Sequence, residues 1–431
     1  MNITVIGLGY VGLTLAVVLV EQGHSVLGLE VNPEIIDKLK NFKSHVKEPG
    51  IEERLKNLVG KKFFVTNNPL KTENYNDAFI FCLPTPLNSG TPDLTYFVRA
   101  VNSTLPFSKK DTLFIVRSTV PVGTTRTLLI PLIKSYEIFS DIQPKVSVCP
   151  ERTAEGKAIL ELKTLPQLAG TESHNIIDSL KVLFSFAPEI INLSTFEAAE
   201  ASKLFCNVYR DIQFALANEF ALLAEEWGFN IFDAVKAINK NYPRANIALP
   251  GLGVGGPCLS KDTYLMASAA KLNKPLVSLT ARKLNEELVK SELLRVMDLI
   301  KGKKALVCGL AFKGEPETND TRNSPGVEVV KFLLNNNFIV YGFDPTVSEN
   351  DCSKLGVIPV MISEVMGEVD LVVIANNNKF FRTEEFRNTL LRTQKECIIL
   401  DGWNMITDLK ERLVVKLGSP FDRWALENCF N

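Results

Sequence analysis

Short runs of consecutive apolar residues recur near both ends of the chain. The first set occupies residues 3–6, 26–29, 79–83 and 113–117, with a glycine turn and a helical pattern between the first two runs. Strands that stay apolar without alternation are typical of parallel sheets covered on both faces. Residues 1–193 are therefore predicted to form a doubly wound α/β domain of the Rossmann type.

A second set of apolar runs lies in the last third of the chain, and residues 325–335 between them carry a helical pattern. These runs predict four further buried strands, at residues 304–308, 338–343, 370–374 and 397–400. We expect residues 301–431 to form a second Rossmann-like domain. The predicted fold class is thus α/β, with two parallel-sheet domains.

The middle of the chain is different, because residues 195–227 carry one long helical pattern. Ser194 and Glu197 have the spacing of a capping box at its start, and Gly228 follows as a stop. A helix of that length would span about 48 Å, more than a small domain needs. We predict that residues 194–300 form a central helical region that joins the two sheets. Its outer face would pair with a second copy, giving a homodimer or a higher homo-oligomer.

Composition narrows the class of protein. The chain has 431 residues, of which 46% are hydrophobic and 23% are charged, and its formal net charge is −1. These values are typical of globular proteins, and the near-neutral charge provides no basic field for nucleic acid. No apolar run reaches the roughly 18 residues of a membrane helix. The first residues lack a basic leader and a cleavage site, so no signal peptide is expected.

The eight cysteines are widely spaced and form no CxxC pair, which argues against a zinc site or a redox motif. Most lie in apolar runs and are expected to be small buried side chains in a reducing, cytoplasmic setting. None of the three histidines lies in a motif, so proton transfer would rely on Lys, Asp and Glu. The cysteines are Cys82, Cys149, Cys206, Cys258, Cys308, Cys352, Cys397 and Cys429.

A glycine motif connects the first predicted strand to the first predicted helix. The first glycine permits a tight turn, the second the approach of a pyrophosphate, and the third close helix packing. Glu30 ends the next strand, where a carboxylate accepts the ribose hydroxyls of NAD and repels the 2′-phosphate of NADP. An NAD site is predicted, and the alternative is a glycine turn beside a solvated glutamate. The motif residues are Gly7, Gly9, Tyr10, Val11 and Gly12.

Two loops follow later strands and would face the same cofactor, since ligands of parallel sheets bind beyond the carboxyl ends of the strands. Thr85 and Pro86 follow the run at 79–83, and Ser118 and Thr119 follow the run at 113–117. Taken alone, both loops are better explained as simple turns.

Two pairs of polar residues are spaced by four. Glu151 and Glu155 would share one face of a helical turn, where one handles a proton or a water molecule and the other orients a substrate. A solvated pair is the common alternative. Lys203 and Asn207 lie on the long helix among apolar neighbours. There the ammonium group would either stabilise an oxyanion or reach solvent.

The most informative segment is the loop that contains Gly251, Gly255 and Cys258. Its glycines allow the backbone to approach a ligand closely. Cys258 is predicted to be a nucleophile, because it ends a glycine-rich loop instead of lying in an apolar run. Lys261 and Asp262 follow it and would supply a positive charge and a base. The alternative is a tight loop with a passive cysteine.

A last motif follows the first strand of the second domain and contains Phe312, Lys313 and Arg322. Its two cations are suited to phosphate or carbonyl groups. A charged surface loop would explain the same residues equally well.

In this order the motifs resemble the UDP-glucose/GDP-mannose dehydrogenase family over essentially the whole chain. They read GLGYVG, PTP, STVPVGT, PER, the helix of Lys203 and Asn207, GVGGPCLSKD and AFKGEPETNDTRNSP. The resemblance implies an NAD domain, a central dimer-forming region and a C-terminal domain that holds a nucleotide sugar. It implies oxidation of the sugar C6 hydroxymethyl group to the uronate by two hydride transfers through a cysteine thioester, in polysaccharide precursor synthesis.

The resemblance also implies roles for single residues. Cys258 would carry the thiohemiacetal and the thioester, Asp262 would assist it, and Lys203 with Asn207 would stabilise the oxyanion. Glu155 and Thr119 would act beside the cofactor in the hydrolysis step. Arg322 would reach NAD, and Arg244 would reach the substrate of the neighbouring subunit. Further substrate contacts would come from Glu151, Arg152, Gly251, Gly255, Phe312 and Lys313.

Two departures refine the resemblance. Glu30 stands where the family commonly has Asp, and its reach is longer. The segments Pro150-Glu-Arg-Thr, Pro243-Arg244 and Pro250-Gly251 look more like the UDP-N-acetylhexosamine branch, whose substrates are UDP-ManNAc and UDP-GlcNAc. UDP-glucose is the alternative substrate. A one-step hydroxyacid-type dehydrogenase and a non-catalytic NAD-binding protein are the competing interpretations.

Overall fold

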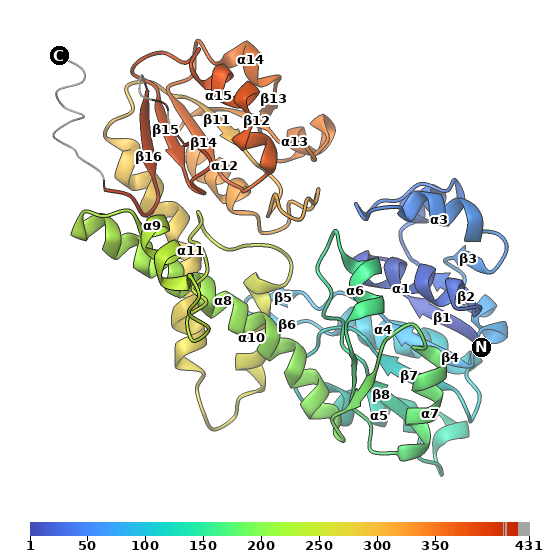
Figure 1. The fold of residues 1–431 in the computed structure, drawn as a ribbon. Helices are drawn as coiled ribbons and strands as arrows, with labels where there is room; N and C mark the ends of the chain where they lie inside the picture. The colour runs from blue at the N-terminus through green and yellow to red at the C-terminus, as the bar shows by residue number, and fades with distance from the viewer. Residues whose placement is uncertain (408, 410–411, 421–431) are drawn as a thin grey trace. The chain divides into compact units, whose positions relative to one another are not determined.

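The computed structural model of the chain describes residues 1–407, 409 and 412–420 (Figure 1). The chain forms two compact units. The N-terminal unit comprises Met1–Cys206 and Tyr264–Lys274, and the C-terminal unit comprises Asn207–Thr263 and Pro275–Asn431. Cys429 lies outside the described residues.

A six-stranded parallel sheet with the strand order β3-β2-β1-β4-β7-β8 forms the centre of the N-terminal unit. Its strands are β1 (Asn2–Ile6), β2 (Ser25–Leu29), β3 (Phe63–Thr66), β4 (Ala78–Phe81), β7 (Leu113–Val116) and β8 (Lys145–Val148). Helices cover both faces: α1 (Tyr10–Glu21), α2 (Pro33–Lys40), α3 (Ile51–Leu58), α6 (Ala158–Thr164) and α7 (His174–Leu183) on one, α4 (Thr95–Thr104) and α5 (Ile130–Lys134) on the other.

The C-terminal unit repeats this topology in the order β13-β12-β11-β14-β15-β16. Its strands are β11 (Lys304–Cys308), β12 (Ile339–Phe343), β13 (Ile358–Pro359), β14 (Leu371–Ile374), β15 (Ile398–Asp401) and β16 (Leu413–Lys416). One face packs on α11 (Leu276–Met297), α12 (Pro325–Asn335) and α13 (Glu349–Lys354), the other on α14 (Ile362–Val365) and α15 (Glu384–Leu390).

Small elements complete both units. They are the hairpin β5 (Leu87–Asn88) and β6 (Thr91–Pro92), the parallel pair β9 (Gln167–Ala169) and β10 (Ile190–Asn192), the 3-10 turns η1 (Pro69–Asn74), η2 (Leu105–Phe107), η4 (Glu137–Phe139) and η5 (Lys379–Arg382), and the π-helical turn η3 (Thr125–Leu129).

The predicted α/β class with two parallel sheets is confirmed. Successive residues of one strand enter opposite cores, as Val5 and Ile6 of β1 do, and both cores are apolar. This explains why the inner strands have continuous apolar runs. All eight predicted strands are the inner strands of the two sheets, whereas the four edge strands were not predicted.

The long central helix α8 (Phe196–Trp227) exists as predicted, and α9 (Ile231–Asn239) and α10 (Leu259–Ala269) follow it. The predicted capping box at its start is wrong. Ser194 has a positive φ of 64°, and the side chain of Thr195 instead accepts the N–H of Ala198 at 3.2 Å. Glu197 pairs with Arg126 and so is not a capping partner.

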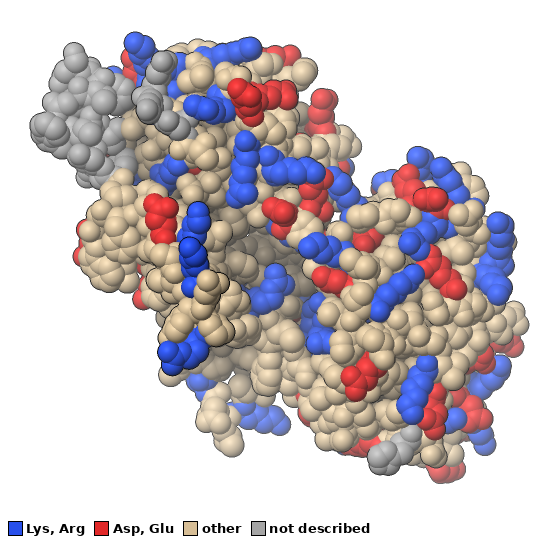
Figure 2. Space-filling view, in the orientation of Figure 1, with Lys and Arg blue, Asp and Glu red and all other residues tan. Residues whose placement is uncertain are grey.

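The surface shows no concentration of one charge on the side seen in Figure 2, where Lys and Arg alternate with Asp and Glu. Among the helices of the described residues, none combines the length and the apolar character needed to cross a membrane.

Candidate functional site

The glycine motif lies where β1 ends and α1 begins, and its geometry fits a dinucleotide. Gly7 has a φ of +87°, which favours glycine. A Cβ on Gly12 would overlap the carbonyl oxygen of Gly7, so only glycine lets this turn pack against α1. Gly9 faces open space, so a ligand can approach its backbone. The free N–H groups at the start of α1 are then available to a pyrophosphate.

Glu30 follows β2 and lies beside this turn. Its carboxylate accepts the backbone N–H of Leu8 at 2.8 Å and those of Val31 and Asn32 at 2.9 and 3.0 Å. The residue is only 8% exposed, so it is not a solvated glutamate. A carboxylate has about four acceptor positions, which leaves one for a ribose hydroxyl. The turn, the helix start and this acid together fit NAD.

The matching acid of the C-terminal sheet is Asp344, directly after β12. One oxygen accepts the N–H groups of Leu310 and Ala311 at 2.8 and 2.9 Å. The other accepts the N–H and the hydroxyl of Thr346 at 2.8 and 2.7 Å. Protein groups therefore occupy all the acceptor positions of Asp344, whereas Glu30 has one acceptor position left over.

His45 was missed as a neighbour of the cofactor acid. Its half-buried ring lies close enough to Leu8 and Glu30 for both to affect its protonation. Burial lowers the pKa of His45, and the Leu8 backbone and Glu30 oppose this effect without cancelling it. Its position between α2 and α3, outside any motif, gave no sequence signal.

The loops after β4 and β7 lie at the carboxyl edge of the N-terminal sheet, as predicted, and they are bonded to each other. The hydroxyl of Thr85 donates to the carbonyl of Thr119 at 2.6 Å, next to Pro86. The hydroxyl of Ser118 accepts the N–H of Leu83 at 2.7 Å. These contacts fix the half-buried Thr119 at the edge where a cofactor would lie.

Glu151 and Glu155 do not share a helical turn, so that expectation is wrong. The segment before α6 is a loop with a turn at Glu155 and Gly156, because it must first leave the edge strand β8. Arg152, which lies between the two glutamates, donates to the carbonyl of Pro166.

Glu151 is buried and forms an ion pair with Arg117 at the end of β7. Its second oxygen accepts the N–H groups of Arg152 and Thr153 at 2.7 and 2.8 Å. Burial acts to raise the pKa of Glu151, but Arg117, the N–H of Thr153 and Lys203 outweigh it and hold that pKa below its ordinary value. Arg117 was missed because it ends an apolar strand.

Tyr10 connects the glycine motif to the loop of Glu155. Its hydroxyl pairs with Glu48 and accepts the N–H of Gly156. Glu48 also accepts the N–H of Ile159 at 3.0 Å, at the start of α6. The predicted cofactor turn and the predicted hydrolysis loop are thus held together within the N-terminal unit.

Lys203 and Asn207 lie one turn apart on α8. Asn207 is buried, and its amide donates to Asp262 at 2.6 Å. The other oxygen of Asp262 pairs with Lys261 at 2.8 Å. Asp262, which is 1% exposed, therefore has one carboxylate oxygen on an ammonium group and the other on an amide donor.

Cys258 is exposed and directly precedes α10. Its carbonyl accepts the N–H groups of Lys261 and Asp262 at 3.1 and 3.0 Å, which is the first turn of the helix. A thiol at a helix N-terminus beside a lysine has the surroundings that favour the thiolate. The exposed position of Cys258 is compatible with the predicted nucleophile.

The loop before Cys258 has glycine where no side chain fits. A Cβ on Gly251 would overlap the ring of Trp403, and a Cβ on Gly255 would overlap the carbonyl oxygen of Asn323. The loop is therefore tightly packed, and its glycines do not make it loose.

The remaining predicted site residues, which are the substrate residues Phe312, Lys313 and Arg244 and the cofactor residue Arg322, lie in the C-terminal unit. Lys313 lies 5.4 Å from the ring centroid of Phe312. Arg322 pairs with Asp320, and the exposed Arg244 packs over the ring of Tyr242 at 5.0 Å. Each of these three cations thus has at least one protein contact near it.

The described cysteines are free thiols. Four are buried as predicted: Cys149, Cys308, Cys352 and Cys397. Cys82 is half-buried, and Cys206 is exposed on α8.

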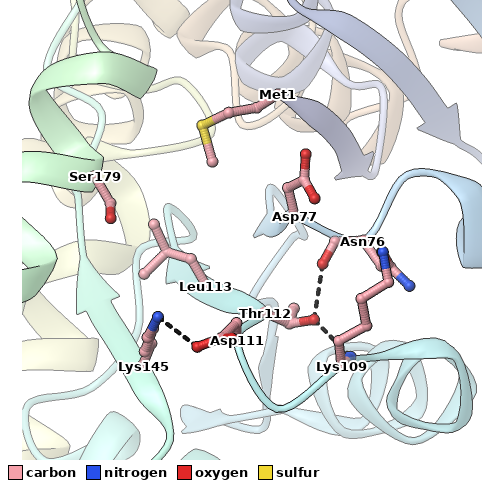
Figure 3. Close-up of a pocket in the computed structure, with 9 residues that line it drawn as sticks. All are labelled: Met1, Asn76, Asp77, Lys109, Asp111, Thr112, Leu113, Lys145 and Ser179. Atoms are coloured by element: carbon pink, nitrogen blue, oxygen red, sulfur yellow. Dashed lines mark hydrogen bonds and ion pairs between the residues drawn. The ribbon is translucent and has the colours of Figure 1, made fainter.

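A small pocket lies away from these residues (Figure 3). It is lined by Met1, Asn76, Asp77 and Thr112 at the amino ends of β1, β4 and β7, and by the ion pair of Lys145 with Asp111. This edge of the sheet is opposite to the one that carries the glycine motif.

Comparisons with known proteins agree with this arrangement. Residues 1–187 match the NAD binding domain, residues 197–287 the central domain and residues 306–408 the UDP binding domain of the UDP-glucose/GDP-mannose dehydrogenase family. UDP-N-acetyl-D-mannosamine dehydrogenase from Pyrococcus horikoshii is 33% identical over 416 residues, which cover 95% of this chain and 96% of that protein.

Solved structures resemble the whole chain. The structure of UDP-D-ManNAc dehydrogenase from Pyrococcus horikoshii has a TM-score of 0.86 at 32% identity and covers 97% of this chain and 99% of that one. The structure of a UDP-glucose dehydrogenase from the hyperthermophilic archaeon Pyrobaculum islandicum has a TM-score of 0.84 at 25% identity and covers 97% of both chains.

Proposed function

Because the chain belongs to the UDP-glucose/GDP-mannose dehydrogenase family, and so is an NAD-dependent nucleotide-sugar dehydrogenase, we propose that its substrate is UDP-N-acetyl-D-mannosamine. Several relatives with 33–35% identity have this activity in their names. The observation that carries the chemistry is the exposed Cys258 at the start of α10, next to Asp262 and Asn207.

Bound NAD would accept the two hydrides of the reaction. The protein's part begins with the sugar C6 alcohol, which loses a hydride and a proton to become an aldehyde. An aldehyde has no second hydride to give until a nucleophile adds to it. The thiolate of Cys258 would form a C–S bond to this carbon, and the resulting thiohemiacetal can lose the second hydride.

The thioester that remains would be hydrolysed by water, which breaks the C–S bond, releases the carboxylate and restores the thiolate. In sum, one alcohol, two NAD⁺ and one water give one carboxylate, two NADH and three protons. Each oxyanion on this route needs a fixed partner. Lys203 and Asn207 would supply it, and Asp262 would take and return the proton.

The hydrolytic water would be activated by Glu155 and Thr119. Glu155 belongs to the loop that Tyr10 and Glu48 connect to the cofactor turn, which supports a role beside the cofactor. Arg322 would contact NAD. Substrate would be held by Arg152, Gly251, Gly255, Phe312 and Lys313, while Glu151 would order the loop through its pair with Arg117.

A second copy of the chain would cover the exposed side of α8 in a homodimer. Three large apolar side chains on that side, Phe205, Tyr209 and Leu216, are 59%, 62% and 45% exposed. At about 100° per residue they form one stripe, and apolar stripes of this kind favour association. Arg244 would then reach the neighbouring subunit's substrate.

We also propose three functional segments: an NAD segment at 1–193, a central segment at 194–300 and a nucleotide-sugar segment at 301–431. The free thiols of the described residues support a reducing, cytoplasmic location.

The function is tested with purified protein, NAD and a panel of UDP-ManNAc, UDP-GlcNAc, UDP-GalNAc, UDP-glucose and GDP-mannose. We expect the highest kcat/KM for UDP-ManNAc, with two NADH and one acid per sugar. Preference for UDP-glucose would reject the substrate, one NADH per sugar would indicate a one-step hydroxyacid-type enzyme, and no turnover at all would indicate a non-catalytic protein.

Cys258→Ser tests the thioester. Without the thiolate, steady-state turnover should fall by at least a thousandfold, while binding of the nucleotide sugar, measured by calorimetry, should stay within threefold. Cys206→Ser removes the other exposed thiol among the described residues and should retain full activity. Full turnover of the Cys258 variant would contradict the scheme.

A further inference from the structure

We propose that a group of buried polar residues on α8 and α11 positions the backbone of the cysteine loop, and through it Cys258, for the reaction. The residues are Asp211, Asn218, Arg282 and Asn285, which we call the loop clamp. None of them belongs to the motifs of the sequence. The inference rests on the proposed function, and it makes these four residues positioning residues for that reaction.

One arm of the loop clamp starts at the beginning of the loop. The N–H of Gly251 donates to Asn218 at 3.0 Å, and the amide of Asn218 donates to Asn285 at 3.0 Å. Asn285 in turn donates to the carbonyl and the carboxylate of Asp211 at 3.0 and 2.9 Å. The donors and acceptors are matched at every step, so the relay has one arrangement.

The other arm holds the loop three residues further on. One guanidinium N–H of Arg282 donates to the carboxylate of Asp211 at 2.8 Å, and a second donates to the carbonyl of Val254 at 2.8 Å. Arginine can do this because its donors form a planar fork. Gly251 and Val254, seven and four residues before Cys258, are thus held by a single network.

Burial makes this network a poor candidate for a purely stabilising device. Asn218 and Asn285 are 0% and 2% exposed, and Asp211 and Arg282 are each 1% exposed. Replacing a buried ion pair with apolar side chains is often neutral or stabilising. Apolar side chains would not provide the hydrogen bonds to the loop backbone, which need the amide of Asn218 and the guanidinium group of Arg282.

The same face of α8 also holds the segment after Cys258. Asn207, Asp211 and Asn218 form one stripe, at about 100° per residue. Asn207 contacts Asp262, and Asp211 accepts the hydroxyl of Thr263 at 3.5 Å, both in the first turns of α10. One helix face therefore contacts the chain on both sides of the nucleophile.

Two variants test the clamp in the full-length protein. Arg282→Lys keeps a positive charge beside Asp211 and loses the second arm to Val254. Asn218→Ala removes the acceptor of the Gly251 N–H at the other end. Displacement of a reacting group by about 1 Å costs on the order of a hundredfold in rate. We therefore expect kcat with UDP-ManNAc to fall ten- to a hundredfold in both, with KM for NAD unchanged within twofold.

A second measurement needs no substrate. The rate of alkylation of Cys258 by iodoacetamide, followed by peptide mass spectrometry against pH, should shift in both variants. Cys206 in the same sample serves as the internal reference and should react at an unchanged rate. This readout separates a failure of the clamp from a failure of the proposed function, since it does not depend on turnover.

The matched control is Arg295→Lys. Arg295 lies on the same helix, pairs with Glu225 of α8, and Glu225 accepts the N–H of Gly418 at 2.6 Å, far along the chain from the cysteine loop. It should keep kcat and the alkylation profile within twofold. The proposal would be overturned if a clamp variant with the wild-type melting temperature also had wild-type kcat and wild-type alkylation. It would be overturned as well if the control lost as much activity as the clamp variants.

Discussion

The ion pair between Arg117 and Glu151 joins the end of β7 to the loop of the proposed hydrolysis step. Their side chains are 0% and 9% exposed. Removing one member of such a pair leaves the other charge buried without compensation, at a cost of about 3–5 kcal/mol. At the scale of single residues, this pair should therefore dominate the stability of the loop.

Glu151→Gln should lower the free energy of unfolding at pH 7 by about 3 kcal/mol, as measured by urea denaturation. Asp111→Asn, in the exposed pair with Lys145, is the control and should change little. An equal effect of both substitutions would contradict the assignment.

The same pair predicts acid sensitivity. The pKa of Glu151 in the folded protein lies below the ordinary value of 4.5, so folding favours the ionised form. Its contribution to stability is complete above pH 4.5 and is lost as the pH falls through the lower, folded value. Unfolding curves between pH 7 and pH 3 should thus fall less steeply for Glu151→Gln than for the wild type.

Single residues show where sequence reasoning ends. Glu151, Cys258 and Asp262 were predicted because they stand in short motifs. Arg117, the partner of Glu151, and Asn218, the partner of Gly251 in the cysteine loop, were not, since they lie 34 and 33 positions from those contacts and have no local signal. Contacts of that kind are created by the fold.

The elements were predictable in proportion to their burial. Inner strands such as β4 and β14 are buried along their whole length, and their apolar runs identified them. Edge strands have one neighbour and need fewer apolar residues, so β8 reads Lys-Val-Ser-Val and β13 has two residues. These two edges therefore had little signal that differs from that of a loop, whereas β3 (Phe-Phe-Val-Thr) and β16 (Leu-Val-Val-Lys) have short apolar runs that the prediction did not use.

The glycine turn and α1 form a single element in functional terms. Gly12→Ala places a Cβ against the carbonyl of Gly7 and must separate the turn from the helix. We expect NADH binding, followed by fluorescence titration, to weaken at least tenfold, with a loss of about 1–3 kcal/mol in stability.

Gly367→Ala is the matched control for that substitution. A Cβ there meets nothing within 4 Å, and its φ is not in the left-handed region. The control should leave NADH binding unchanged. Unchanged binding in Gly12→Ala would show that the turn tolerates the displacement and would weaken the cofactor assignment.

At the scale of the whole molecule, α8 carries exposed large apolar side chains on one side. Phe205 and Leu216 are both exposed, so replacing them with Glu should change the stability of an isolated chain by about 0.5 kcal/mol or less each. If a second copy covers this stripe, the double variant should sediment as a monomer where the wild type sediments as a dimer.

Met361→Glu is the control for the association experiment, because Met361 is also exposed, at 67%, and lies in the C-terminal sheet domain. It should sediment as the wild type does. A monomeric wild type, or a dimeric double variant, would rule out α8 as the interface.

The two sheets have the same strand order, yet their acids after the second strand have been put to different use. The carboxylate of Asp344 accepts backbone N–H groups and the hydroxyl of Thr346 at all four acceptor positions. Glu30 accepts three N–H groups, so one of its acceptor positions can take a sugar hydroxyl. A dinucleotide placed on the second sheet would find the same strand order, but no carboxylate oxygen available to accept a hydroxyl of its ribose. Two sheets of the same topology thus need not accept the same ligand.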